Sequence, residues 1–200
     1  MNKTVIEPNL VVINSYSMDN NTYIIFNQKE AVVIDPSFNG DDVIKQIHSD
    51  VKVVAVLLTH AHFDHSFETS KLLEKYDCNV YMLSSEKETY KLYDCSDWFE
   101  REVPDFSSKL KFISAGKQKI GDFDLEILHT PGHTSGGMTI IFKNYVFVGD
   151  TLFFDSYGRT DLYNSSQQQM KQSIKLLFKT INFFSISLYL FLRRLIPSLK

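Results

Sequence analysis

The sequence predicts a mixed α/β fold in which two similar halves contribute to one site between two stacked sheets. Short apolar runs rich in branched side chains recur along the chain, and helical patterns separate several of them. Two of these runs lead into loops rich in histidine, at residues 60–65 and 129–137. Loops at strand ends often carry chemistry on a rigid scaffold. We therefore expect each half to supply part of the site.

The first half contains both strand and helix patterns. Asn27 to Glu30 form a polar hairpin turn. Pro36 ends the strand at residues 31–34, because proline cannot continue a strand ladder. Asn39 and Gly40 then make a turn before a helix. The run at 53–58 is charge-free, as is typical of a central strand. Acidic residues open the first helix, and Ser84 is the expected cap of the third. Strands are predicted at residues 10–13, 23–26, 31–34, 53–58, 80–83 and 109–113, and helices at 41–48, 67–76 and 86–93.

The second half is predicted to be mostly hairpins. Turns at Gly121 and Asp122 and at Lys143 and Asn144 connect neighbouring strands. A helix follows at residues 167–179, with one apolar face. Strands are predicted at residues 118–120, 125–128, 138–142 and 145–148. Residues 94–108 are loop-like and hold Trp98, which either covers the site or anchors packing; the sequence leaves both alternatives open.

Composition narrows the class of protein. The chain has 200 residues, 44% hydrophobic and 22% charged, which suits one globular domain with a sizeable core or two small ones. The net charge is −3 and Arg193 with Arg194 is the only basic cluster, so a nucleic-acid partner is not indicated. Cys78 and Cys95 are too few for a disulfide framework and fit buried thiols in a reducing compartment. With no apolar signal segment, we expect a cytoplasmic protein.

The loop at residues 60–65 carries the strongest chemical signal. His60, His62, Asp64 and His65 offer neutral imidazole and carboxylate groups, which are good ligands for Zn²⁺ and Fe²⁺. His60 and His62 are two positions apart, so in an extended segment they point the same way and can share one metal. Asp64 and His65 lie where the chain turns and can address a second metal. The alternative, a polar helix start with solvated histidines, explains fewer of these residues.

Two further candidate ligands follow in the second half. His133 lies in a tight loop with proline and three glycines, and Asp150 directly follows an apolar strand. With these two in place, the chain resembles the metallo-β-lactamase superfamily over about residues 10–178. The resemblance implies an αββα sandwich with metals at one edge of the two sheets. The matching motifs are His60-x-His62-x-Asp64-His65, Thr130-Pro131-Gly132-His133-Thr134 and Gly149-Asp150-Thr151-Leu152.

The resemblance also implies roles for these residues. His60, His62 and His133 would bind a first metal, Asp64 and His65 a second, and Asp150 would bridge both. Asp64 and Asp150 are also the expected catalytic carboxylates. The expected cofactor is Zn²⁺, one or two ions, with Fe or Mn as alternatives. His129 matches no ligand position. It is expected to be either an ordinary loop residue or a residue that orients a ligand.

Within the superfamily, the chain resembles the short hydroxyacylglutathione hydrolases, or glyoxalase II-like proteins. The Thr130–Thr134 motif and the Gly-Arg-Thr-Asp-Leu run at residues 158–162 carry this similarity. It implies hydrolysis of a small-molecule thioester by metal-activated water, without a serine or cysteine nucleophile. Arg159 would contact the substrate or pair with Asp161, and the pair is slightly favoured.

The C-terminal end departs from the family pattern. The family has a last histidine ligand there, whereas no histidine follows His133 in this chain. We therefore expect a metallo-β-lactamase-like domain at residues 1–180 and an atypical apolar tail at 181–200, altered or truncated relative to the family. A shift of reading frame near Thr180 is favoured over a diverged final strand and helix or a membrane-binding segment. The tail is too short to span a bilayer. The second metal should then bind weakly.

Two other functions stay open at this level. A persulfide dioxygenase of the same superfamily would hold one iron through positions matching His60, His133 and Asp150. An inactive metal-binding remnant is the second alternative. A β-lactamase role is not favoured without a secretion signal, and an RNA nuclease lacks a basic surface. A membrane partner is not expected, and the oligomeric state is left open.

Overall fold

A computed structural model describes residues 3–7, 9–15, 20–92, 105–153 and 155–183. Trp98 and Cys95, most of the predicted loop at 94–108, Arg193 and Arg194, and the tail from residue 184 lie outside the described residues. The expectations for these parts stay predictions.

The first sheet has seven strands in the order β1-β2-β3-β4-β5-β6-β7. The strands β1 to β4 pair antiparallel, and β4 to β7 pair parallel. Because parallel neighbours need a crossover, helices follow β4, β5 and β6. The strands are β1 (Lys3–Glu7), β2 (Leu10–Ser15), β3 (Asn20–Phe26), β4 (Glu30–Ile34), β5 (Lys52–Leu57), β6 (Asn79–Leu83) and β7 (Leu110–Ile113).

The second sheet has four antiparallel strands in the order β11-β10-β9-β8. Two predicted hairpins are confirmed: Gly121 and Asp122 join β8 to β9, and Lys143, in the left-handed region, helps join β10 to β11. The strands are β8 (Gly116–Ile120), β9 (Phe123–His129), β10 (Met138–Phe142) and β11 (Tyr145–Phe147).

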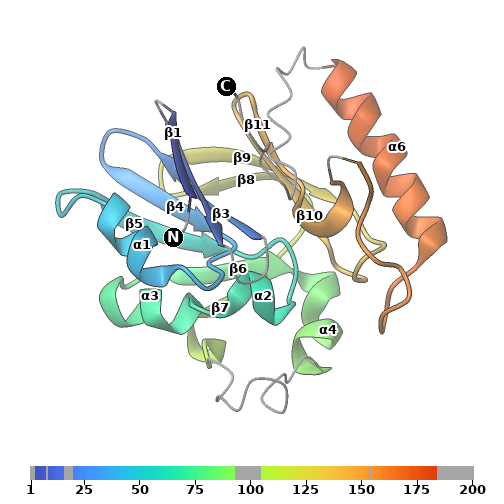
Figure 1. Ribbon diagram of the computed structural model, residues 1–200, viewed down its shortest axis with the longest axis horizontal. Coiled ribbons are helices and arrows are strands. Elements are labelled where there is room, and N and C mark those ends of the chain that lie inside the picture. The colour runs from blue at the N-terminus through green and yellow to red at the C-terminus, as the bar shows by residue number, and fades with distance from the viewer. Residues whose placement is uncertain (1–2, 8, 16–19, 93–104, 154, 184–200) are drawn as a thin grey trace.

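The helices cover the outer faces of both sheets. Val43 of α1 and Leu72 of α3 pack on the first sheet, and Leu177 of α6 packs on the second, on the opposite side of the molecule (Figure 1). A third apolar cluster, with Ile34, Leu57 and Ile127, fills the space between the sheets. This layering is the predicted αββα sandwich. The helices are α1 (Gly40–Gln46), α2 (Phe63–Ser66), α3 (Thr69–Lys75), α4 (Lys87–Leu92) and α6 (Gln167–Phe183).

The helix predictions needed the most correction. The helix expected at 67–76 is α3, which begins two residues later, at Thr69, and ends at Lys75. The ligand loop, in which no helix was expected, itself forms the short α2. Ser84 lies inside a 3₁₀ turn, η1 (Ser84–Glu86), and makes no capping bond. The last helix continues to Phe183, beyond the predicted end at residue 179. The strand β1 was not predicted.

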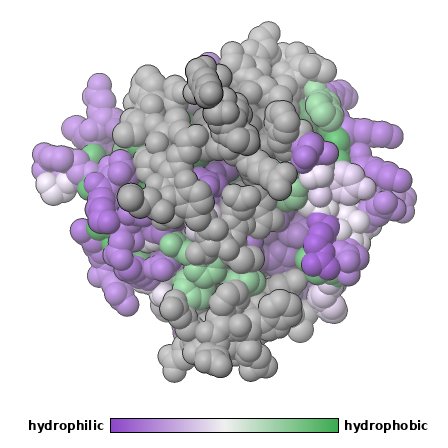
Figure 2. Space-filling view, in the orientation of Figure 1, coloured by the Kyte–Doolittle hydropathy of each residue, from purple (hydrophilic) through white to green (hydrophobic). Residues whose placement is uncertain are grey.

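The described surface is largely hydrophilic on both flanks of the face shown in Figure 2. No helix among the described residues is both long and apolar enough to cross a membrane.

Candidate metal centre

The site begins where two parallel strands end side by side. The N–H of Asp35, just after β4, donates to the carbonyl of Leu57 at the end of β5. The residues that follow β5 lead directly into the loop at 60–65. Carboxyl ends of parallel strands open at the same sheet edge, which is the usual place for a site in such sheets. The β4–β5 pairing therefore brings Asp35 next to the histidine-rich loop.

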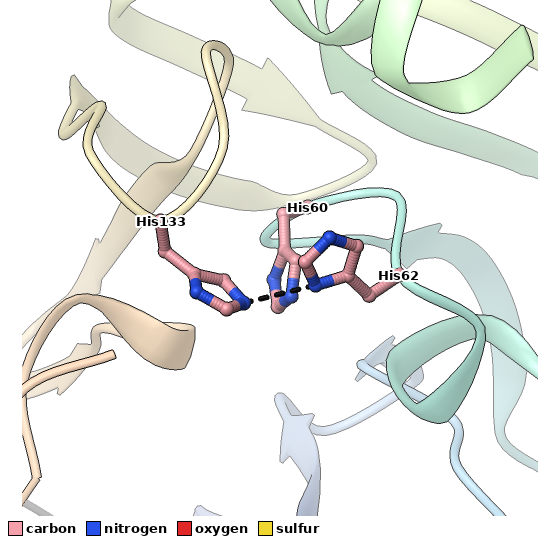
Figure 3. A group of neighbouring side chains, drawn as sticks. All are labelled: His60, His62 and His133. Carbon is pink, nitrogen blue, oxygen red and sulfur yellow. Dashed lines mark hydrogen bonds between the residues drawn. The ribbon is translucent and has the colours of Figure 1, made fainter. Parts of the chain in front are cut away.

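Three histidines from two loops converge at this edge. One ligand atom from each of His60, His62 and His133 lies within 4.8 Å of the other two, and all three side chains are buried. The Nε2 atom of His133 is 2.9 Å from Nδ1 of His62. Figure 3 shows the rings pointing toward one another, His60 and His62 from one loop and His133 from the other.

A second group shares His60 with the first. Ligand atoms of His60, His65 and Asp150 also lie within 4.8 Å of one another. Asp150 lies between the two groups: its Oδ1 is 3.2 Å from Nε2 of His65, and its Oδ2 is 3.4 Å from Nε2 of His133. The Oδ2 atom of Asp64 is 3.8 Å from Nε2 of His65. The fold thus brings together all six residues predicted as ligands, and their binding of metal stays a prediction.

Hydrogen bonds made by their Nδ1 atoms orient three of the histidine rings. His65 donates from Nδ1 to Asp35 Oδ2 at 2.9 Å, and His133 donates from Nδ1 to the carbonyl of Arg159 at 2.9 Å, since both acceptors can only accept. Nδ1 of His60 lies 3.1 Å from the Thr59 hydroxyl, which itself donates to Asp35. Each of these rings therefore turns its Nε2 atom into the site.

Asp35 is a functional residue that the sequence analysis missed. Its carboxylate accepts the N–H of Thr59 at 2.7 Å, the hydroxyl of Thr59 at 2.6 Å and Nδ1 of His65. Its backbone has φ +50°, in the left-handed region that non-glycine residues rarely adopt. Such conformations persist where the surroundings hold them, often at functional sites. In the sequence, Asp35 directly precedes Pro36, and this position indicates only the end of a strand.

Asn20 is a second missed residue, at the start of β3. Its side-chain amide donates to both the Asp64 carbonyl at 2.6 Å and Asp64 Oδ2 at 3.0 Å. These bonds fix the direction of the Asp64 carboxylate. No local pattern around Asn20 indicated this contact, because the two residues are 44 positions apart.

The charges of the cluster fit a divalent cation. Burial lowers the pKa of His65, but the carboxylates of Asp35, Asp150 and Asp64 outweigh it and raise that pKa well above its usual range. Buried carboxylates beside imidazole nitrogens thus attract positive charge to this position. Imidazole and carboxylate are the donors that Zn²⁺ and Fe²⁺ share. The residues present therefore fit a transition metal of this kind.

Other candidate residues lie around the site or away from it. His129 is bonded through Nε2 to the Ser135 carbonyl at 2.9 Å, on the surface, so it does not orient a ligand. Arg159 makes a two-bond ion pair with Asp161, with both distances 3.0 Å, as the favoured alternative predicted. Contact of Arg159 with a substrate stays a prediction. His48 is exposed beside Asp50, away from the site.

Known proteins are similar to this chain in sequence and in fold. The chain is 33% identical over 159 residues to the probable polyketide biosynthesis zinc-dependent hydrolase BaeB of Bacillus velezensis, covering 78% of this chain and 65% of that protein. It therefore spans just under two thirds of BaeB. It is 30% identical over 176 residues to the hydroxyacylglutathione hydrolase GloC of Haemophilus influenzae, covering 84% of this chain and 82% of that one.

A solved structure, TTHA1623 in a di-iron-bound form, matches the fold with a TM-score of 0.74 and 27% identity, covering 84% of this chain and 85% of that one. Residues 18–180 match the family described as the metallo-beta-lactamase superfamily. The match extends over most of the chain and includes the αββα layers and the histidine-rich edge. The chain therefore belongs to the metallo-beta-lactamase superfamily.

Proposed function

We propose that this protein is a metal-dependent hydrolase of small-molecule thioesters, with hydroxyacylglutathione compounds as the favoured class. The observation that carries the proposal is the convergence of five buried imidazole and carboxylate side chains at one sheet edge, with the carboxylate of Asp64 beside His65 as a sixth. Superfamily membership supports metal-dependent hydrolysis in general. The thioester class is the finer part of the proposal.

Two overlapping ligand sets follow from the arrangement. We assign a first metal to His60, His62, His133 and Asp150, and a second to Asp64, His65 and Asp150. Zn²⁺ is the proposed ion, and Fe is the main alternative because TTHA1623 is known in a di-iron-bound form. When bound, such an ion supplies Lewis acidity, which makes water more acidic and polarises a carbonyl group.

The protein's own residues would handle orientation and protons. Asn20 holds one oxygen of Asp64, and that carboxylate is the proposed acceptor of a hydrogen bond from the attacking water. The water oxygen forms a bond to the acyl carbon as the carbon–sulfur bond breaks. The sulfur leaves with the electron pair and takes a proton, which gives a carboxylic acid and a thiol. Each turnover therefore consumes one water molecule.

A protein thiol is not the proposed nucleophile. Cys78 is buried on the first sheet, and burial raises the pKa of its thiol to about 11. Only the thiolate is a good nucleophile, so Cys78 is unreactive at neutral pH. Within the part of the chain that the structure describes, no reactive thiol is therefore available, which supports direct attack by water.

One comparison supports thioesters, and one residue next to the site suggests how an anionic substrate would be held. GloC, a hydroxyacylglutathione hydrolase, is similar over most of both chains. Arg159 is exposed next to the site, since its carbonyl accepts from His133. We propose that its guanidinium meets an anionic group of the substrate, for which it would exchange its partner Asp161.

The test is release of thiol from an S-(2-hydroxyacyl)glutathione by protein reconstituted with Zn²⁺, Fe²⁺ or Mn²⁺, followed with a thiol reagent. The oxygen ester of the same acid is tested in parallel, and its hydrolysis is followed as released acid. We expect faster turnover of the thioester, and almost none with His133→Ala. Equal thiol release by wild type and His133→Ala would overturn the proposal. Sulfite formation from glutathione persulfide by the iron form, without thioester cleavage, would replace it with the dioxygenase.

A further inference from the structure

Glu86 is a buried carboxylate outside both ligand sets. It ends the turn η1 after β6 and directly precedes α4. Its side chain is 0% exposed, which is rare for glutamate unless its oxygens are satisfied. The metal assignments and the hydrolysis proposed above make no use of it.

The two oxygens of Glu86 bind the two histidine loops. Oε1 accepts the N–H of Ala61 at 3.0 Å, and Ala61 lies between His60 and His62. Oε2 accepts the N–H of Gly136 at 2.7 Å, and Gly136 is three residues after His133. One carboxylate thus connects the loop that leaves the first sheet to the loop between β9 and β10 of the second.

Close packing around Gly136 supports the same contact. A Cβ at this position would overlap the backbone of Glu86, so only glycine permits the approach. The Ser135 hydroxyl also donates to the carbonyl of Ser85 at 3.2 Å and lies 3.3 Å from the Thr89 hydroxyl. The turn before α4 and the His133 loop therefore meet through several bonds, and Glu86 extends the connection to the other loop.

We propose that Glu86 is a positioning residue that sets the distance between His133 and the pair His60 and His62, and thereby the affinity of the first metal set. This rests on the proposed role of these histidines as ligands. Metal sites tolerate ligand displacements of only about 0.2 Å. Because the two bonds run from one side chain to two different loops, separating the loops would break at least one of them.

The test compares Glu86→Gln with Glu74→Gln, a substitution of the same charge on the exposed surface of α3. The glutamine at position 86 keeps the shape but offers one acceptor oxygen, so its NH₂ must face one of the two N–H donors. We expect Glu86→Gln to bind Co²⁺ and Zn²⁺ about 10- to 100-fold more weakly than wild type. The visible spectrum of its Co²⁺ form should also change, whereas Glu74→Gln should match wild type in both.

The outcomes separate the two proposals. If wild type binds no metal with useful affinity, the proposed function fails. If wild type binds metal tightly and Glu86→Gln matches it in affinity and spectrum, only the inference about Glu86 fails. If Glu86→Gln does not fold, amide hydrogen exchange on metal-free wild type decides. Protected N–H groups at Ala61 and Gly136 support the inference, and unprotected ones overturn it.

Discussion

Nε2 of His133 lies 2.9 Å from Nδ1 of His62, although the two residues are 71 positions apart in the chain. At this distance the two nitrogens share a hydrogen bond, with one ring as donor and the other as acceptor. The ring that donates carries its proton on this nitrogen, whereas a metal ligand must offer a lone pair there. If both nitrogens hold the first metal, the donor ring must therefore carry its proton on its other nitrogen.

The first prediction concerns His133 and uses His129 in the same loop as control. His133→Ala should abolish tight binding of metal by the first ligand set, because it removes one of the three converging imidazoles. Substitution of residues that hydrogen-bond to metal ligands lowers metal affinity or activity by roughly 10- to 100-fold. Loss of a ligand itself should therefore lower thioesterase activity by more than about 100-fold. His129→Ala removes only a surface contact to Ser135 and should retain metal and activity. Metal content by elemental analysis checks both variants, and equal metal in both would contradict the assignment.

The second prediction concerns Asp35, which never touches the substrate in our proposal. Asp35→Asn leaves one acceptor oxygen for three donors, from Thr59 and His65. We expect metal affinity to fall about 10- to 100-fold and the free energy of unfolding to fall by about 1–3 kcal/mol. The matched control is Asp50→Asn, whose side chain is exposed. Isothermal titration with Zn²⁺ and urea unfolding measure the two effects, and unchanged affinity would show that Asp35 does not orient the ligands.

The contrast between His60 and Asp35 shows what the sequence could predict. His60 follows a charge-free strand and is one of four potential ligands in six residues, so a local pattern was enough. The importance of Asp35 depends on the parallel pairing of β4 with β5, and that of Asn20 on a contact with Asp64. Glu86 resembled an ordinary residue of a helix start. Contacts between distant segments decide these roles, and periodicity within one segment does not report them.

The third prediction is unequal metal loading. Among the described residues, the first set has three histidines and Asp150, whereas the second set has one histidine, His65, with Asp64 and Asp150. Titration with Zn²⁺ should therefore show one tight equivalent and a second that a weak chelator removes. Two equivalents of equal, tight affinity would contradict this, and would mean that another group completes the second set.

The fourth prediction tests how α6 holds the second sheet. Leu177 is fully buried against Ile141 and Val146, whereas its neighbour Leu176 is 39% exposed. Leu177→Ala should lower the free energy of unfolding by about 2–5 kcal/mol, because it leaves a cavity under the helix. Leu176→Ala should change it by less than about 1 kcal/mol. Urea unfolding of both variants gives the comparison, and equal losses would mean that α6 does not pack as described.

The last prediction concerns the pH dependence that Glu86 gives to stability. Burial raises the pKa of Glu86 to about 7, despite hydrogen bonds from Ala61 and Gly136 that lower it, whereas the unfolded chain has the ordinary value of 4.5. Between these values the folded protein holds more protons than the unfolded chain, so its free energy of unfolding falls as the pH rises. Over the whole interval this contribution reaches at most about 3 kcal/mol.

Glu86→Gln cannot titrate and should lack this slope. With a chelator present, the free energy of unfolding of Glu86→Gln relative to wild type should therefore increase from pH 5 to pH 8. Other groups, such as His65, titrate in both proteins and cancel in the difference. A difference that is the same at both pH values would show that Glu86 is ionised without cost. The expected increase would mean that the ionised carboxylate of Glu86 lowers the free energy of unfolding at neutral pH. The same carboxylate holds the two histidine loops together, so the order of the metal site is obtained at a cost in stability of the fold.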